Sequence, residues 1–133
     1  MIVRPIVLET EYPAFAEWWS ARGFPAPPKP LLEDAHGFAV TAGIDILAGW
    51  LFVCGKTAFL EWIVGNPAVA SSTTTRESVL TLLDFLNGYA KGIGVCALLC
   101  STRDDGSLGR LMQRVGWAKC EGPPHQLYAK GVI

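Results

Sequence analysis

Residues 58–90 constrain the fold more than any other part of the chain. The run 58–64 is apolar and strand-like, the turn Gly-Asn-Pro follows at 65–67, and five hydroxyl side chains fill 71–75. The apolar residues of 76–90 recur every three or four positions, which predicts an amphipathic helix. The start of a helix presents unpaired backbone N–H groups and the positive end of the helix dipole. This stretch therefore predicts an anion site where the helix begins.

Length and composition favour one apolar domain. A chain of 133 residues is expected to form a single domain over 1–133 with one core. Half of the residues are hydrophobic and only 17% are charged, which leaves room for a homodimer interface. The formal charge of −1 gives no general attraction to nucleic acid, so nucleic acid is not an expected partner. No apolar stretch of about 20 residues and no secretory signal is visible, so we expect no membrane contact and a cytoplasmic location.

The cysteines do not indicate a metal site. They form no CxxC pair, and the chain contains only two histidines. We expect reduced, buried thiols at Cys54, Cys96, Cys100 and Cys120.

The other elements follow from periodicity and turn residues. Thr10 is the expected N-cap of the first helix, and Thr74 with Glu77 the expected capping box of the long one. The apolar run 95–101 is expected to be a central strand covered on both faces, reached by a parallel crossover. The expected order is strand 1–8, helix 9–22, proline-rich surface segment 24–30, strands 37–42, 46–54 and 58–64, helix 76–90, strand 95–101, helix 107–115, and a final strand or strand pair within 118–133.

This order resembles that of the Gcn5-related N-acetyltransferases, the GNAT family, over nearly the whole chain. The most specific local match is Leu111-Met-Gln-Arg-Val-Gly-Trp117, which is similar to the family's Leu-Tyr-x-x-x-Gly-Phe segment, with Asp105 as a helix cap. Arg4-Pro5 is similar to the family's opening Ile-Arg-Pro. The resemblance implies an α/β fold with a mixed, largely antiparallel sheet, a parallel βαβ crossover and helices on both faces. It also implies acetyl transfer from acetyl-CoA to an amine on a small molecule or a protein.

The cofactor loop departs from the family pattern. In the family, two small residues of this loop let backbone amides hold the pyrophosphate of acetyl-CoA, whereas 69–80 contains no glycine. Hydroxyl groups are the expected replacement, with Arg76 neutralising phosphate charge. The alternative is a polar helix start with a solvated Arg76. The resemblance also implies a strand amide that polarises the thioester, freed by a bulge at 65–67. The expected cofactor-binding residues are Ile63, Val64, Ser71, Ser72, Thr73, Thr74, Thr75 and Arg76.

Two residues are the catalytic candidates. Glu61 is the expected base, because flanking apolar residues raise its pKa if it points into the cleft; the alternative is a solvent-facing Glu61. Met112 stands where the family has its proton-donating Tyr, so Tyr128 is the candidate acid, with core packing as its alternative. The acceptor pocket is expected at Trp18, Trp19, 24–30 and 123–126.

Two other functions stay open. Missing loop glycines and the missing Tyr favour a non-catalytic GNAT-fold protein that acts through protein contacts. A divergent enzyme that modifies a nucleobase is the third reading, and the net charge argues against it.

Overall fold

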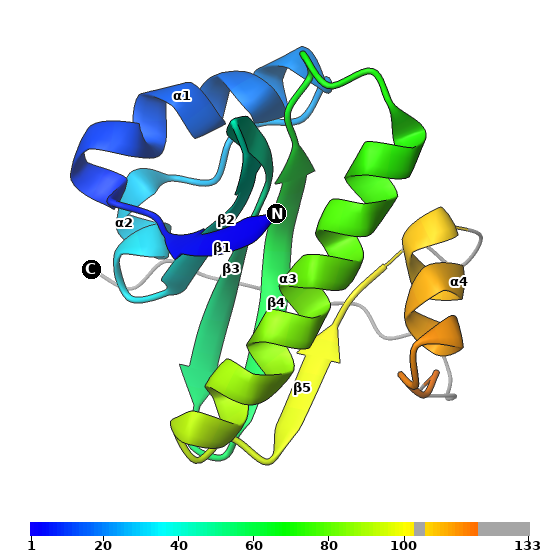
Figure 1. Cartoon of the computed structure of the whole chain (residues 1–133). Helices are drawn as coiled ribbons and strands as arrows, with labels where there is room; N and C mark the ends of the chain where they lie inside the picture. Colours follow the sequence, from blue (N-terminus) through cyan, green and yellow to red (C-terminus); the bar gives the residue numbers. More distant parts are fainter. Residues whose placement is uncertain (103–105, 120–133) are drawn as a thin grey trace. The chain divides into compact units, whose positions relative to one another are not determined.

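The structure is a computed structural model that describes residues 1–102 and 106–119. The chain divides into two compact units, Met1–Ser101 and Thr102–Ile133. The expectation of a single domain over 1–133 stays a prediction. The elements are β1 (Ile2–Pro5), α1 (Leu8–Ala21), α2 (Lys29–Glu33), β2 (His36–Ala42), β3 (Ile44–Cys54), β4 (Thr57–Gly65), α3 (Ser72–Gly92) and β5 (Ala97–Cys100) in the first unit and α4 (Ser107–Arg114) in the second (Figure 1).

The first unit is built on a five-stranded sheet in the order β1-β2-β3-β4-β5. Strands β1 to β4 pair antiparallel, and β5 pairs parallel with β4 after the crossover through α3. The expected mixed sheet with one parallel βαβ unit is therefore confirmed. Strand β1 ends at Pro5 and lies at the sheet edge, where a residue without an N–H group is tolerated.

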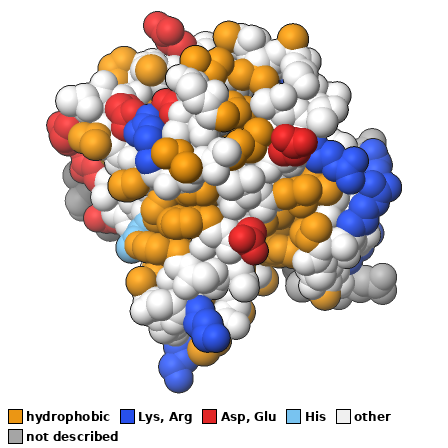
Figure 2. Space-filling model, in the orientation of Figure 1, with side chains coloured by type: hydrophobic (Ala, Val, Ile, Leu, Met, Phe, Trp, Pro, Cys, Tyr) orange, Lys and Arg blue, Asp and Glu red, His pale blue; other side chains and the backbone are white. Residues whose placement is uncertain are grey.

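Helices cover both faces of this sheet, as expected (Figure 1). Helix α3 contacts β1, β2 and β3, whereas α1 contacts β4 and α2. We call the two sides the α3 face and the α1 face. Most of the surface seen in Figure 2 is hydrophobic side chain or is uncharged side chain and backbone, and charged side chains cover a smaller part of it. This agrees with a composition that is 17% charged.

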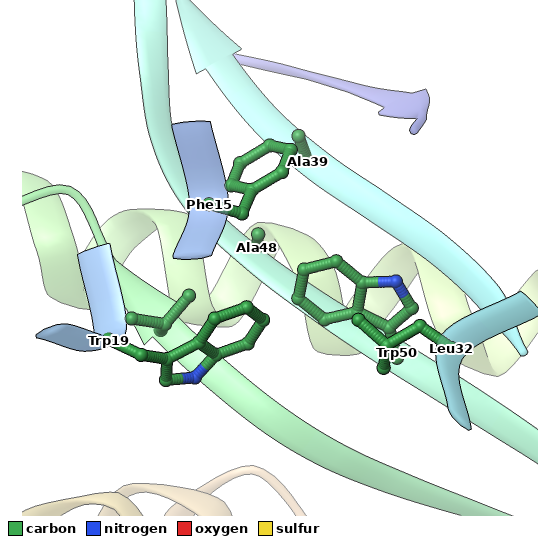
Figure 3. Packing of buried hydrophobic residues seen from close by; sticks show 7 residues of the cluster. Phe15, Trp19, Leu32, Ala39, Ala48 and Trp50 are labelled. Carbon is green, nitrogen blue, oxygen red and sulfur yellow. The ribbon is translucent and has the colours of Figure 1, made fainter. Parts of the chain in front are cut away.

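The core of the α1 face is built around Trp50 of β3 (Figure 3). Phe15 and Trp19 of α1 and Leu32 of α2 pack on it, and each is at most 3% exposed. The Phe15 and Trp50 rings meet edge to face, with centroids 5.7 Å apart. Gly37 makes room for the indole, because a Cβ at position 37 would lie 2.6 Å from Trp50 Nε1.

Helix α3 begins at Ser72, four residues before the expected start. Ser71 is its N-cap, and the Ser71 Oγ accepts a hydrogen bond from the Thr74 N–H at 3.2 Å. The expected capping box of Thr74 and Glu77 is therefore wrong. Nothing after Pro67 prevents an earlier start, so residues 72–75 form the first helical turn rather than a loop.

The first part of the chain differs from expectation in two places. Helix α1 has Val7 rather than Thr10 as its N-cap, and the Glu11 carboxylate accepts the Val7 N–H at 2.6 Å. The short helix α2 differs from the expected surface segment 24–30, in which three prolines precede α2 and a fourth, Pro30, lies inside it. Pro30 lies in its first turn, where the missing N–H has no helical partner to lose.

Strand β5 and the cysteines are more exposed than the sequence predicts. Among the described residues β5 is an edge strand, and Ala97 and Leu99 are exposed, so the expectation of a strand covered on both faces is wrong there. Cys54 and Cys96 are exposed and Cys100 is half-buried, so their thiols are free but not buried as expected. Cys120 lies outside the described residues.

The second unit contributes α4, which ends as expected at Gly116 and Trp117. Gly116 has φ 98°, and the Trp117 N–H donates to the Met112 carbonyl at 3.0 Å, which closes a Schellman-type cap. Gly106 holds the N-cap position, and the expected cap Asp105 lies outside the described residues, as do residues 120–133 of the expected last strands. No described helix has the length and hydropathy that a membrane span requires.

Candidate functional site

Strand β4 changes its surroundings after Leu60. Up to Leu60 it is paired on both edges, with β3 on one side and β5 on the other, and the last β5 pair is Leu60 with Cys100. From Glu61 to Gly65 it keeps only β3, since no strand in the described ranges pairs with its other edge. The backbone N–H and C=O groups on that edge therefore have no strand partner among the described residues.

A β-bulge lies at the same point. Trp50 pairs with Glu61 and Ala48 with Val64, so Gly49 opposes both Trp62 and Ile63. Trp62 has φ 57°, and it is the one non-glycine residue with positive φ in the described part of the chain. Such a conformation costs about 1–3 kcal/mol for a bulky residue and is typical of functional sites.

The bulge is therefore three residues earlier than expected. Gly65 pairs regularly with Leu47, so the expectation of a bulge at 65–67 is wrong. Gly49 explains the position, because a Cβ there would lie 3.2 Å from Leu82 Cδ2 and 3.3 Å from Leu60 Cδ1. Helix α3 thus packs closely on the strand opposite the bulge.

Glu61 lies on the α1 face beside the bulge. Its ladder partner Trp50 points into the core of that face, and directly paired residues of a sheet share a face. The side chain is half-buried, and this burial raises the pKa of the carboxyl above its usual value. Burial and the charge of Glu61 together raise the pKa of the Cys100 thiol to about 11. Cys100 is therefore a neutral thiol near neutral pH and a poor nucleophile.

The open edge of β4 leads toward the N-terminus of α3. The Ser72 and Thr73 N–H groups have no carbonyl four residues earlier within the helix, and their side chains are exposed. Thr75 Oγ1 instead donates to the Ser71 carbonyl at 3.2 Å, so this hydroxyl already has a partner. Arg76 is exposed and forms no ion pair within the described residues.

Arg22 is a basic residue of this region that the sequence analysis missed. It follows α1, and its Nη2 donates to the Gly65 carbonyl at 3.4 Å. Nη2 lies 3.2 Å, and Thr75 Cγ2 3.9 Å, from the place of a Cβ at Gly65. The guanidinium is therefore near both the end of β4 and the first turn of α3. The only signal in the sequence is a basic residue just before Gly23, which indicates no neighbour 43 residues away.

The structure places the remaining predicted site residues in different surroundings. Ile63 lies at the bulge, and Val64 next to it is 5% exposed in the core. Trp19 is 3% exposed in the core, so the expectation that it lines an open pocket is wrong. Trp18 is half-buried and packs edge to face on Phe15, and its place in the acceptor pocket stays a prediction. Tyr128 lies outside the described residues. Met112 is 4% exposed, and a thioether donates no proton.

Solved structures of acetyltransferases share this fold at low sequence identity. The ribosomal-protein-S18-alanine N-acetyltransferase of Escherichia coli superposes with a TM-score of 0.71 and 18% identity, over 90% of this chain and 79% of that one. An aminoglycoside N-acetyltransferase in complex with CoA gives 0.66 and 13%, over 96% and 99%. The aminoglycoside 6'-N-acetyltransferase of Acinetobacter haemolyticus gives 0.62 and 14%, over 100% of both chains. No protein-family model and no curated sequence matches the chain.

Proposed function

This chain has the fold of the GNAT acetyltransferases, and from that premise we propose that it transfers an acetyl group from acetyl-CoA to an amine. The observation that carries the proposal is the open edge of β4, which begins at the bulge of Trp62 and ends near the N-terminus of α3. A ligand on this edge meets backbone groups that no described strand pairs with at one end and a positive helix end at the other.

The phosphates of acetyl-CoA bind at the first turn of α3 in this proposal. The Ser72 and Thr73 N–H groups, together with nearby hydroxyls, donate to the pyrophosphate. Arg22 and Arg76 supply positive charge that no described carboxylate neutralises. Ser71 acts indirectly, because its Oγ is used to cap the helix.

The acetyl group lies at the bulge. A backbone N–H of Ile63 or Val64 polarises the thioester carbonyl and stabilises the oxyanion of the tetrahedral intermediate. Glu61 takes a proton from the acceptor ammonium, and its raised pKa suits a base that works near neutral pH. The amine nitrogen then bonds to the acetyl carbon, the C–S bond breaks, CoA leaves as a thiolate, and the second proton that the amine nitrogen loses passes to solvent.

The leaving group requires little acid assistance at mildly alkaline pH. A free thiol has a pKa of about 8.5, so the thiolate can depart and take its proton from water. Met112 cannot supply that proton. Tyr128 remains the predicted acid.

Calorimetric titration with acetyl-CoA tests the proposal. Ligand at roughly 100 times its dissociation constant is expected to stabilise the protein by about 2.7 kcal/mol in a parallel thermal scan. Arg22→Ala and Arg76→Ala are each expected to raise the dissociation constant about tenfold, the equivalent of about 1.4 kcal/mol. Lys91→Ala, at the opposite end of α3, is the matched control and is expected to leave binding unchanged.

S-acetylpantetheine, which lacks the pyrophosphate, sharpens the test. It is expected to bind more weakly than acetyl-CoA and to be insensitive to Arg22→Ala and Arg76→Ala. Equal loss of affinity for both ligands would contradict phosphate binding at α3. Absence of binding at millimolar acetyl-CoA would overturn the proposed function and favour the non-catalytic alternative.

A further inference from the structure

The α1 face of the sheet carries an exposed apolar patch beside Glu61. Phe59 pairs with Phe52 of β3, which packs against the core of the α1 face, so Phe59 points to that face. Leu99 of β5 pairs with Phe59 and shares its face. Phe59 is 40% exposed and Leu99 is 36% exposed, although both are large apolar side chains. Together with Glu61 and Trp62 they form what we call the β4–β5 patch.

Trp62 belongs to the same patch because of the bulge. Strict alternation would turn residue 62 away from Glu61, but the Trp62 ring meets the Trp19 ring edge to face on the α1 side, with centroids 6.3 Å apart. Trp19 is 3% exposed, whereas Trp62 is 37% exposed. The Trp62 ring is thus held against the core by Trp19, and part of the indole remains exposed on the face that Glu61 shares.

The residues of the patch have complementary chemistry. A carboxylate next to an indole binds an ammonium group by charge and by cation–π attraction. Phe59 lies two residues before Glu61 on the same face, roughly 7 Å along the strand, so an apolar group joined to that ammonium by two or three bonds reaches it. A polar, multiply hydroxylated amine would instead leave hydroxyl groups against Phe59 and Leu99 without partners.

Building on the proposed acetyl transfer, we propose that the acceptor is a primary amine attached to an apolar or aromatic group, bound on the β4–β5 patch. Trp62 and Glu61 hold the ammonium next to the bulge, while Phe59 and Leu99 contact the apolar part. Glu61 both attracts the ammonium and accepts its proton.

The test compares 2-phenylethylamine with ethylamine, spermidine and kanamycin as acceptors, with released thiol as the readout. The kcat/KM for 2-phenylethylamine is expected to exceed that for ethylamine by at least about tenfold, because the phenyl group buries apolar surface on the patch. Phe59→Ala is expected to remove most of this preference by raising KM for 2-phenylethylamine only. Val53→Ala is the control, since Val53 is 39% exposed on the neighbouring strand and is not part of the patch.

A second readout does not depend on turnover. Calorimetry of 2-phenylethylamine with the wild-type chain and with Trp62→Leu is expected to show weaker binding for the variant, because leucine lacks the π face.

Transfer to spermidine or kanamycin without preference for 2-phenylethylamine would overturn this inference and leave the proposed function intact. If acetyl-CoA does not bind, the proposed function fails, and absence of amine binding at millimolar concentration then overturns the inference as well. A patch that covers a second copy of the chain would appear as a dimer that Phe59→Ala dissociates, and this result would also overturn it.

Discussion

One face of one sheet is used in two different ways. On the β2–β3 half of the α1 face, Phe15, Trp19 and Leu32 bury Trp50, and Gly37 admits the indole with no space to spare. On the β4–β5 half, Phe59 and Trp62 are of similar size yet remain more than a third exposed. The first half gains stability from packing, whereas the second half keeps apolar surface, a half-buried carboxylate and a positive φ that add nothing evident to stability. This difference is what identifies the second half as the candidate site.

The largest expected difference between the halves is at their tryptophans. Trp50→Ala removes a fully buried ring and is expected to reduce the free energy of unfolding by about 3–5 kcal/mol. Trp62→Ala loses one edge-to-face contact and is expected to cost about 1 kcal/mol or less. Urea unfolding followed by circular dichroism measures both. Equal losses would break the distinction between a packed half and an open half.

The next largest effect on the free energy of unfolding is expected when a glycine in the packed core is replaced by alanine. Gly37→Ala forces a methyl group against Trp50 and is expected to cost about 1–3 kcal/mol. Gly88→Ala in α3 is the matched control, because a Cβ at position 88 would meet no packing neighbour within 4 Å. The control is expected to gain about 0.5–1 kcal/mol from helix propensity. A neutral Gly37→Ala would mean that the β2–β3 half is less tightly packed than the structure indicates.

An ion cluster links β1 to α1 and β3, on the β2–β3 half of the α1 face. Arg4 bonds Glu11 at 2.5 Å and Asp45 at 2.6 Å, and the hydrogen bond from Arg4 lowers the pKa of the Glu11 carboxyl. Because the folded pKa is the lower one, the stabilisation is present above the unfolded pKa of about 4.3 and is lost as pH falls through the folded pKa. Glu11→Gln is expected to cost about 1 kcal/mol near neutral pH after allowance for solvent screening.

Thermal midpoints measured from neutral to acidic pH check this prediction. The difference between wild type and Glu11→Gln is expected to shrink as the solution becomes acidic. Glu17→Gln, an exposed carboxylate with no ion pair among the described residues, is the control and is expected to leave the midpoints unchanged. A difference that stays constant with pH would show that the Glu11 charge is not what stabilises the cluster.

The smallest effect on stability is expected for a substitution of Glu61, in the β4–β5 half of the α1 face. Burial raises the folded pKa of Glu61, so the stabilising protonated form is lost as pH rises through that pKa. Glu61→Gln is therefore expected to match or exceed the wild-type stability by a few tenths of a kcal/mol near neutral pH. The same change is expected to lower kcat by at least about 100-fold. Chemical denaturation and the thiol-release assay check the two effects, and a clear loss of stability would assign Glu61 to the packed half instead.

The hydrophobic pattern predicts the described strands and the parallel crossover, and Gly116 predicts the end of α4. Local interactions at the helix starts account for two differences from the pattern. Ser71 is the N-cap of α3 because nothing after it interrupts the helix, and Pro30 is tolerated in the first turn of α2. The short β5 and its exposed side were missed because an all-apolar run does not reveal whether a second layer covers it.

Residue type and position in the sequence predict candidate site residues but not their geometry. Glu61 is a candidate because it lies within the strand that precedes the hydroxyl residues, and those residues are candidates because they lie where the helix begins. The bulge at Trp62 depends on how Gly49 packs against Leu82, which is a tertiary contact without a local signal. Arg22 joins the site through a contact across 43 residues, and no pattern near Arg22 encodes it.

Amide hydrogen exchange by NMR with and without acetyl-CoA tests the acetyl-CoA site most directly. The Ile63 or Val64 amide and the Ser72 and Thr73 amides are expected to gain protection when acetyl-CoA binds, because these groups acquire hydrogen-bond partners. Amides of β2 and β3 away from the site serve as the internal reference. Binding that leaves β4 and the start of α3 unchanged, while it protects amides elsewhere, would contradict the assignment of the open edge as the acetyl-CoA site.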